Sequence, residues 1–104
     1  MIKATIIWTA SAKTELRKIY QYYKDKASIA LAQKIKNNIL FSPEILKTHP
    51  LAGQEEESLK ALQEGHRYLV EGNYKIIYKV VEKKIFLTDV FDSRQNPAKL
   101  KKKK

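Results

Sequence analysis

The chain has 104 residues, the length of one ordinary domain, and its 43% apolar and 31% charged residues are typical of a globular protein. It has no cysteine, which excludes disulfides and thiolate chemistry, and no apolar run near the ~20 residues that a membrane helix needs. Its 21 Lys and Arg against 11 Asp and Glu give a net charge of +10, which favours a polyanion or an acidic protein as partner, the alternative being that the charge serves solubility alone. The first residues do not resemble a signal peptide, so we expect a cytoplasmic protein without a membrane partner.

Residues 2–8 predict a β-strand, because apolar and polar residues alternate along them. Its more apolar face comprises Ile2, Ala4, Ile6 and Trp8. The period then changes to that of a helix, and Thr9 or Ser11 supplies a side-chain oxygen suited to capping its first amides. The apolar stripe of this helix comprises Ala12, Leu16, Ile19, Tyr20 and Tyr23.

A second helix is predicted after Ser28, which is a suitable N-cap. Its apolar stripe comprises Leu31, Ala32, Ile35 and Ile39. Pro43 interrupts it, so we expect either a kink or a new start with Ser42 as cap, and Leu46 stays on the buried face. The short connection between the two helices predicts an antiparallel hairpin.

The second half of the chain predicts strands at residues 67–70, 74–81 and 85–91, which are rich in β-branched and aromatic residues. Gly72-Asn73 suits a two-residue turn between the first two of these strands. Before them, residues 58–62 predict one helical turn. The order β-α-α-β-β-β indicates an α+β fold, with the helical hairpin packed on one face of a small, mostly antiparallel sheet. We expect a single domain over residues 1–98 and a basic, disordered tail at 99–104.

The common enzyme motifs are missing from the sequence. It has no glycine loop for phosphate, and His49 and His66 lack the spacing of metal ligands. Asp89 and Asp92 lie on the last strand, but two carboxylates are a weak metal signal and pairing with Lys or Arg is the better interpretation. We therefore expect neither a metal nor a cofactor.

Several cationic residues and tyrosines lie on or next to the predicted strands. They are Arg67, Lys75, Lys79, Arg94, Tyr68, Tyr74 and Tyr78. Such a surface can hold phosphates and stack bases, or the tyrosines can be packing residues and the arginines partners of Asp89, Asp92 or the acidic run Glu55–Glu57. For Tyr78, packing is favoured. Apolar residues on both faces of residues 74–81 predict that the second face is also covered.

Several local motifs follow one another in a distinctive order. They are Trp8-Thr9, Ala12 to Tyr23, Ala32 to Ile39, Pro50 to Gly53, Arg67 to Leu69, Tyr74 to Tyr78, and Val90 to Pro97. Over nearly the whole chain this order resembles the RelE/ParE superfamily, the toxins of type II toxin–antitoxin (plasmid stabilisation) modules.

The resemblance implies a toxin that inhibits bacterial growth and is neutralised by a co-expressed antitoxin, whose acidic, partly disordered tail suits a basic chain. It further suggests a homodimer or a heterotetramer with the antitoxin. The expected docking surface is the groove between the helical hairpin and the sheet, with apolar anchors at Leu16, Ile19, Tyr23 and Ile39.

Two mechanisms exist within the superfamily. RelE-like members cut messenger RNA on the ribosome, and the resemblance assigns this chemistry to Arg67 and Lys75. Where those nucleases carry a terminal acid or base, this chain has Ser93-Arg94-Gln95, and arginine does not shuttle protons. ParE-like members instead poison DNA gyrase, which we favour, with Arg94, Gln95 and Asn96 as target-binding residues. A basic binding module without toxicity is the third alternative.

Overall fold

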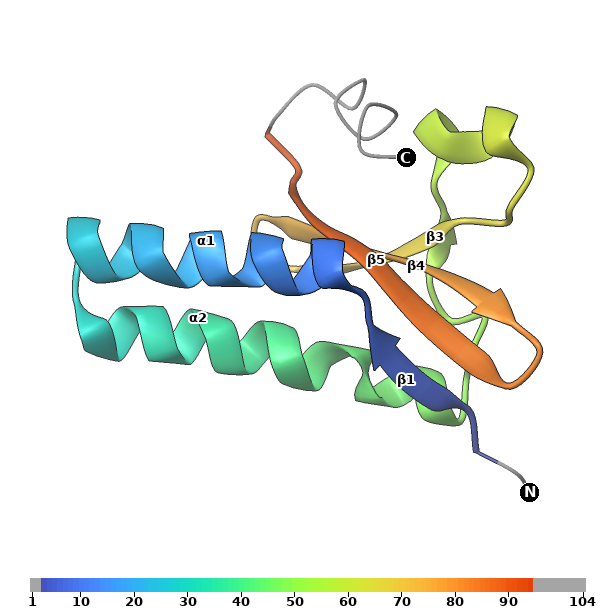
Figure 1. The fold of residues 1–104 in the computed structure, drawn as a ribbon, viewed down its shortest axis with the longest axis horizontal. Helices are drawn as coiled ribbons and strands as arrows, with labels where there is room; N and C mark the ends of the chain where they lie inside the picture. Colours follow the sequence, from blue (N-terminus) through green and yellow to red (C-terminus); the bar gives the residue numbers. More distant parts are fainter. Residues whose placement is uncertain (1–2, 95–104) are drawn as a thin grey trace.

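A helical hairpin lies across one face of a five-stranded sheet in the computed structural model, which describes residues 3–94 (Figure 1). The elements are, in chain order, β1 (Thr5–Trp8), α1 (Ala10–Lys26), α2 (Ile29–Phe41), the 3-10 helix η1 (Ser42–Lys47), β2 (Gln54–Glu55), the 3-10 helix η2 (Glu57–Leu62), β3 (Arg67–Glu71), β4 (Tyr74–Val81) and β5 (Lys84–Asp92). This confirms the predicted α+β class, the helical hairpin and the three-stranded meander. No helix within residues 3–94 has both the length and the apolar character needed to span a bilayer.

The strands are arranged in the order β1-β5-β4-β3-β2, and only β1 and β5 run parallel. The parallel pair is possible because the whole helical hairpin and the meander separate β1 from β5 along the chain. Strand β2 was not predicted. It has only two residues, too few to show alternation, and it forms through its pairing with β3.

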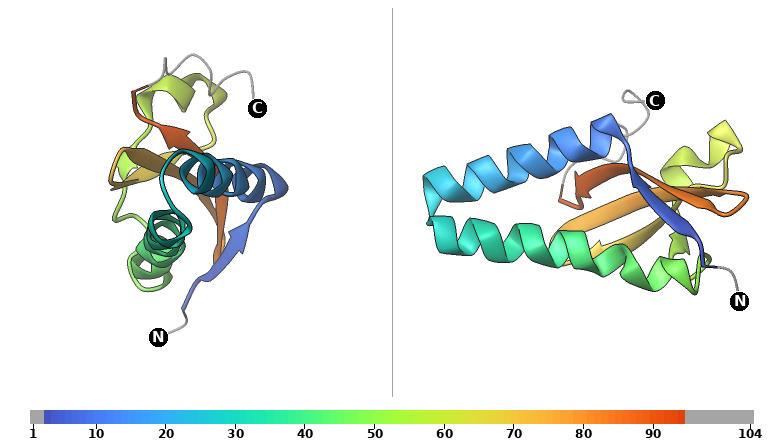
Figure 2. Two further views of the ribbon diagram at one scale, coloured as in Figure 1. Left: turned by 90° about the vertical axis from the view of Figure 1, so that its left-hand side faces the viewer. Right: turned by 60° about the horizontal axis from the view of Figure 1, so that its bottom comes forward.

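Side-chain caps begin both long helices where the sequence predicts them. The Thr9 hydroxyl accepts a hydrogen bond from the Ala12 amide at 3.2 Å, and the Ser28 hydroxyl accepts one from the Leu31 amide at 3.0 Å. Of the two alternatives predicted at Pro43, the new start with Ser42 as cap is wrong. The backbone of Ser42 is already helical (φ −52°, ψ −41°), so α2 passes directly into η1. Figure 2 shows the two helices side by side against the sheet.

The main core lies between the helical hairpin and the sheet. Its fully or nearly buried residues include Ala12, Leu16, Ile39, Leu46, Ile76, Tyr78, Ile85 and Leu87. Of the predicted face of the first strand, Ala4, Ile6 and Trp8 contact this core, and Ile2 lies outside the described residues. Leu31 is 39% exposed, contrary to the prediction, because the buried stripe of α2 follows Ala32, Ile35 and Ile39, one position further along the helix.

A second, smaller cluster covers part of the opposite face of the sheet. Leu59 of η2 packs on Ile77 and Phe91, with Tyr68 at its margin. The predicted cover on this face is therefore supplied, at least in part, by the chain itself. The predicted tail at 99–104 lies outside the described residues.

Candidate functional site

Arg67 and Lys75, the two cations expected to serve a nuclease, lie on opposite faces of the sheet. Residues paired across two strands point to the same face, and neighbours along one strand alternate. Arg67 pairs with Tyr78, which belongs to the core under the helices. Lys75 pairs with Val70 and lies two residues before Ile77, so both point to the face that η2 covers. The two cations therefore do not converge on one phosphate.

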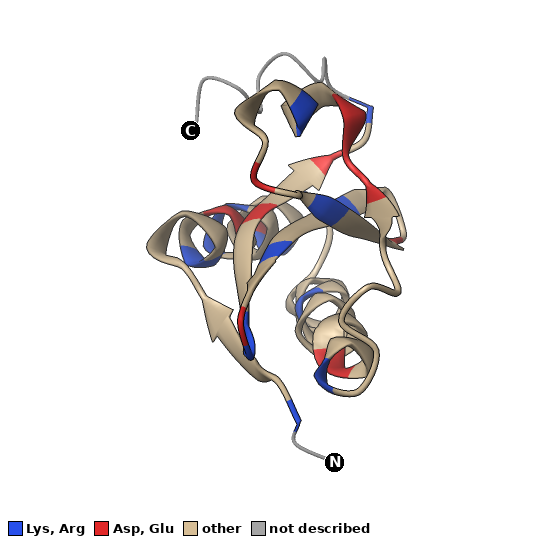
Figure 3. Cartoon of the chain, turned by 90° about the vertical axis from the view of Figure 1, so that its right-hand side faces the viewer, with Lys and Arg blue, Asp and Glu red and all other residues tan. Residues whose placement is uncertain are grey.

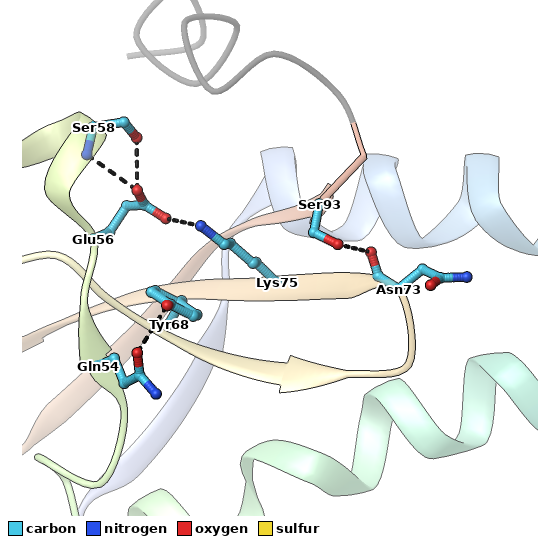
Figure 4. A network of polar contacts seen from close by, with 7 residues as sticks. All are labelled: Gln54, Glu56, Ser58, Tyr68, Asn73, Lys75 and Ser93. Carbon is cyan, nitrogen blue, oxygen red and sulfur yellow. Dashed lines mark hydrogen bonds and ion pairs between the residues drawn. The ribbon is translucent and has the colours of Figure 1, made fainter.

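Lys75 is held in a polar network on the η2 side of the sheet (Figure 4). Its Nζ donates to Glu56 Oε1 at 3.1 Å and lies 4.3 Å from the centroid of the Tyr68 ring. The other oxygen of Glu56 accepts from the Ser58 amide at 3.1 Å and from its hydroxyl at 2.8 Å, while the Tyr68 hydroxyl donates to Gln54 Oε1. Burial raises the pKa of Glu56, but the hydrogen bonds from Ser58 and Lys75 together lower it below its ordinary value. Glu56 is thus ionised and paired.

On the face under the helices, Arg67 stabilises the corner of the chain between η1 and β2. Its Nη1 donates to the Gly53 carbonyl at 2.8 Å. The Tyr78 hydroxyl donates to the Pro50 carbonyl and accepts from the Gly53 amide, both at 2.9 Å. Burial raises the pKa of Tyr78, and the Gly53 hydrogen bond and the charge of Arg67 offset part of that rise. Within residues 3–94, Arg67 thus binds the Gly53 carbonyl and forms none of the ion pairs that the sequence analysis considered for it.

Arg94 forms the ion pair with Asp92 that the sequence analysis offered as an alternative role. Its Nε and Nη2 donate to the two carboxylate oxygens at 2.9 and 2.7 Å, and its amide donates to Oδ1 at 2.9 Å. The hydrogen bond from Arg94 lowers the pKa of Asp92 and raises that of Arg94 itself. The Arg94 side chain remains 63% exposed, so it is oriented and still open to a partner. Gln95 and Asn96 lie outside the described residues.

A cleft of about 370 Å³ lies between α1 and the end of β5, and Arg94 lines it. Ile19 and Tyr22 form its helical wall, and Tyr74 and Asp92 form its sheet wall. Tyr22, which is 57% exposed, was not predicted as a site residue, although it stands beside the apolar stripe of α1. The cleft brings together one residue predicted for the target and one predicted for the antitoxin.

The four predicted antitoxin anchors divide into two pairs. Leu16 and Ile39 are 8% and 0% exposed in the chain's own core. Ile19 and Tyr23 are only partly buried. The Tyr74 hydroxyl donates to that of Tyr23 at 3.4 Å, and burial, followed by this contact, raises the pKa of Tyr74. The groove prediction therefore depends on Ile19 and Tyr23 for contact with a partner.

The histidines and aspartates of the described residues do not assemble a metal centre. Among residues 3–94, no group of three or more acidic or histidine side chains lies close enough to hold an ion. Asp89 accepts from the Val90 amide at 2.9 Å, and His49 Nδ1 lies 2.9 Å from the Thr48 hydroxyl.

One family model matches most of the chain, and a solved structure shares its fold. The model of the family described as ParE toxin of type II toxin-antitoxin system, parDE, matches residues 6–97. Among solved structures, the chain is similar to one titled "Chromosomal ParDE TA system from P. aeruginosa", with a TM-score of 0.74 and 21% identity over 86% of this chain and 96% of the other. None of the curated proteins is significantly similar to the chain in sequence.

Proposed function

Because the chain belongs to the ParE toxin family of type II toxin–antitoxin systems, we propose that it arrests bacterial growth by acting on DNA gyrase in the cytoplasm, as part of a module that stabilises plasmids. An acidic antitoxin neutralises it in a complex of the two proteins. The complex suits the charge of the chain, since a toxin of net charge +10 attracts an acidic segment.

The separation of Arg67 from Lys75 is the observation that favours gyrase over messenger RNA. In-line cleavage of RNA needs cations around one phosphate and a group that shuttles a proton. Here both cations are engaged on opposite faces of the sheet, Lys75 by Glu56 and Arg67 by the Gly53 carbonyl. Arg94, in contrast, is exposed at the end of β5, where the predicted target-binding segment begins.

The test is induced expression without antitoxin in a susceptible bacterium, with DNA breaks and messenger RNA cleavage followed in the same culture. We expect breaks and a damage response with intact messages, and inhibition of supercoiling when the purified chain is added to gyrase. Codon-positioned cleavage of translated messages without breaks would instead identify a RelE-like nuclease. Normal growth with abundant folded protein would favour a binding module.

Variants at Arg94 and Lys75 separate the two mechanisms. We expect Arg94→Ala to reduce gyrase inhibition at least tenfold, because it removes the exposed guanidinium, and its exposed pair with Asp92 adds little to stability. Lys75→Ala should retain inhibition, since Lys75 is engaged by Glu56 on the η2 side of the sheet. The supercoiling assay measures both, with Lys84→Ala, an exposed cation at the start of β5, as control. Loss of growth arrest in Lys75→Ala but not in Arg94→Ala would contradict the assignment.

A further inference from the structure

A row of basic residues runs along the side of α1 on which Tyr20 meets α2. Lys13, Arg17, Tyr20 and Lys24 are spaced by four, three and four residues, which places them in one line along the helix. Lys36 of α2 adds a cation to this line, because its Nζ lies 5.1 Å from the centroid of the Tyr20 ring. We call the four cations, Lys13, Arg17, Lys24 and Lys36, the hairpin row. Its members on α1 span about 16 Å of the helix axis.

The hairpin row lies apart from the core and from the cleft between α1 and β5. The buried residues of α1 are Ala12 and Leu16, and the wall that α1 gives to the cleft includes Tyr22. The three members of the row on α1 do not line that cleft, and all three are exposed. The row is therefore a separate surface of the hairpin.

No carboxylate of the described residues 3–94 forms an ion pair with the hairpin row. No acidic residue stands three or four positions from any of its members, the spacing at which side chains on a helix meet. The two acidic residues of the hairpin have other contacts. Glu15 lies 3.5 Å from Lys18, and Asp25 accepts from the side-chain amide of Gln21 at 3.1 Å. Figure 3 shows acidic positions gathered where the chain enters η2, away from the helices.

This arrangement of charges is unfavourable for the helix itself. Lys13 and Arg17 are like charges four residues apart, and such a pair destabilises a helix. Lys13 also ends the first turn of α1, where the helix dipole favours an acidic residue and where none is present. Departures from local rules of stability are expected mainly at functional sites. A bound ligand therefore accounts for the row better than folding does.

The hairpin row fits the phosphate backbone of a double-stranded nucleic acid. A line of cations about 16 Å long matches about five phosphates of one duplex strand, which follow one another at ~3.4 Å along the axis. Single strands bind to aromatic rings that are open for stacking, whereas Lys36 lies over the ring of Tyr20. An acidic amphipathic protein segment would need apolar anchors. On α1, Ala10–Lys26, the exposed large apolar side chain is that of Tyr22, which lines the cleft.

We propose that the hairpin row binds the phosphate backbone of a nucleic-acid duplex without reading its sequence. Each cation contacts phosphate oxygens and releases the counterions that are condensed on the duplex. The site goes beyond the proposed function and does not depend on it, because neither the toxin's target nor the antitoxin enters the argument.

The experiment is a titration of a fluorescent DNA duplex of about 20 base pairs with the full chain, followed by anisotropy at several salt concentrations. We expect a dissociation constant of about 10⁻⁶–10⁻⁴ M at physiological salt, as is typical of binding without sequence preference. Arg17→Gln/Lys24→Gln should weaken binding about tenfold or more and reduce the slope of log K against log salt by about two. Glutamine is a good helix former, and thermal unfolding checks that the variant folds.

Lys83→Gln/Lys84→Gln is the matched control. It lowers the net charge from +10 to +8, as the variant of the row does, but removes two exposed lysines at and just before the start of β5. The control should bind within about threefold of the wild type with an unchanged salt slope. A parallel titration with an RNA duplex identifies the source of the backbone, because the biological ligand is expected to bind more tightly.

Four results would overturn the proposal. Equal losses in both double variants would show that net charge alone attracts the duplex. Unchanged binding in both would place the contact on other cations of the chain. Tighter binding of a single strand than of either duplex would contradict the duplex geometry. Tighter binding of labelled polyglutamate than of the duplexes would make the row a site for an acidic protein. Since growth arrest and gyrase inhibition enter none of these outcomes, failure here leaves the proposed function intact.

Discussion

Tyr78 is a core residue whose hydroxyl forms hydrogen bonds with two backbone groups. It is fully buried at the centre of β4 and bonds both the Pro50 carbonyl and the Gly53 amide. These two groups belong to the corner that leads from η1 to β2, where no regular ladder is available to satisfy them. Gly53 is required at this place, because a Cβ there would lie 2.6 Å from the Tyr68 carbonyl oxygen and 2.7 Å from the Tyr78 ring. The corner and the sheet are thus joined by one side chain.

Removing that hydroxyl should therefore destabilise the fold. We expect Tyr78→Phe to lower the free energy of unfolding by about 1–3 kcal/mol, because the buried Gly53 amide and Pro50 carbonyl lose their partner. Tyr22→Phe is the control, since Tyr22 is 57% exposed, and it should change stability by less than ~0.5 kcal/mol. Urea denaturation followed by circular dichroism measures both. Equal stability of the two variants would show that the corner bonds are energetically neutral.

At the scale of elements, periodic segments were predictable and short irregular ones were not. Strand β4 was predicted with its observed bounds, Tyr74–Val81, and α1 begins after Thr9, one of the two caps predicted for it. Both carry local signals, alternation in one case and a capping residue before an apolar stripe in the other. Strand β2 carries no such signal, because two residues become a strand only when β3 lies beside them.

The candidate site was harder to predict than the fold. Arg67 and Lys75 were grouped because the resemblance assigned both to RNA cleavage, yet the face of each depends on register, which pairing with a neighbour fixes. Leu16 and Ile39 have the spacing of an apolar stripe, and such a stripe does not distinguish a core from a docking surface. The ion pair of Arg94 with Asp92 was foreseeable, because the two residues are adjacent in the chain apart from Ser93.

Helix η2 covers part of the sheet face opposite the helical hairpin. Its residue Leu59 is 1% exposed, whereas Leu62 in the same short helix is 39% exposed. We expect Leu59→Ala to cost about 2–5 kcal/mol, since it opens a cavity against Ile77 and Phe91. Leu62→Ala should cost less than ~1 kcal/mol. Thermal or urea unfolding tests this, and similar losses in the two variants would mean that η2 does not anchor through Leu59.

At the scale of the whole molecule, ion pairs neutralise the sheet half and leave the helical hairpin basic. The cations of residues 43–94 that pair with carboxylates are Lys47, Lys60, Lys75, Lys79 and Arg94. Among the ion pairs between residues 3–94, one involves a cation of the hairpin: Lys18 lies 3.5 Å from Glu15. The positive electrostatic potential of the protein is therefore strongest at the helical hairpin. Such a potential attracts an acidic partner to the helices.

This asymmetry predicts that the position of a charge, and not only the net charge, controls association with the antitoxin. The double variants Lys34→Glu/Lys36→Glu and Lys83→Glu/Lys84→Glu each reverse two charges and lower the net charge from +10 to +6. The first pair lies on α2, and the second lies at the β4–β5 turn, remote from the helical cations. We expect the association rate constant, measured by stopped flow at low salt, to fall about tenfold for the first and less than threefold for the second. The difference should shrink as added salt shortens the Debye length, because the steering acts across solvent. Equal losses in both double variants would show that only net charge matters, and an unchanged rate in both would mean that association is not steered by charge.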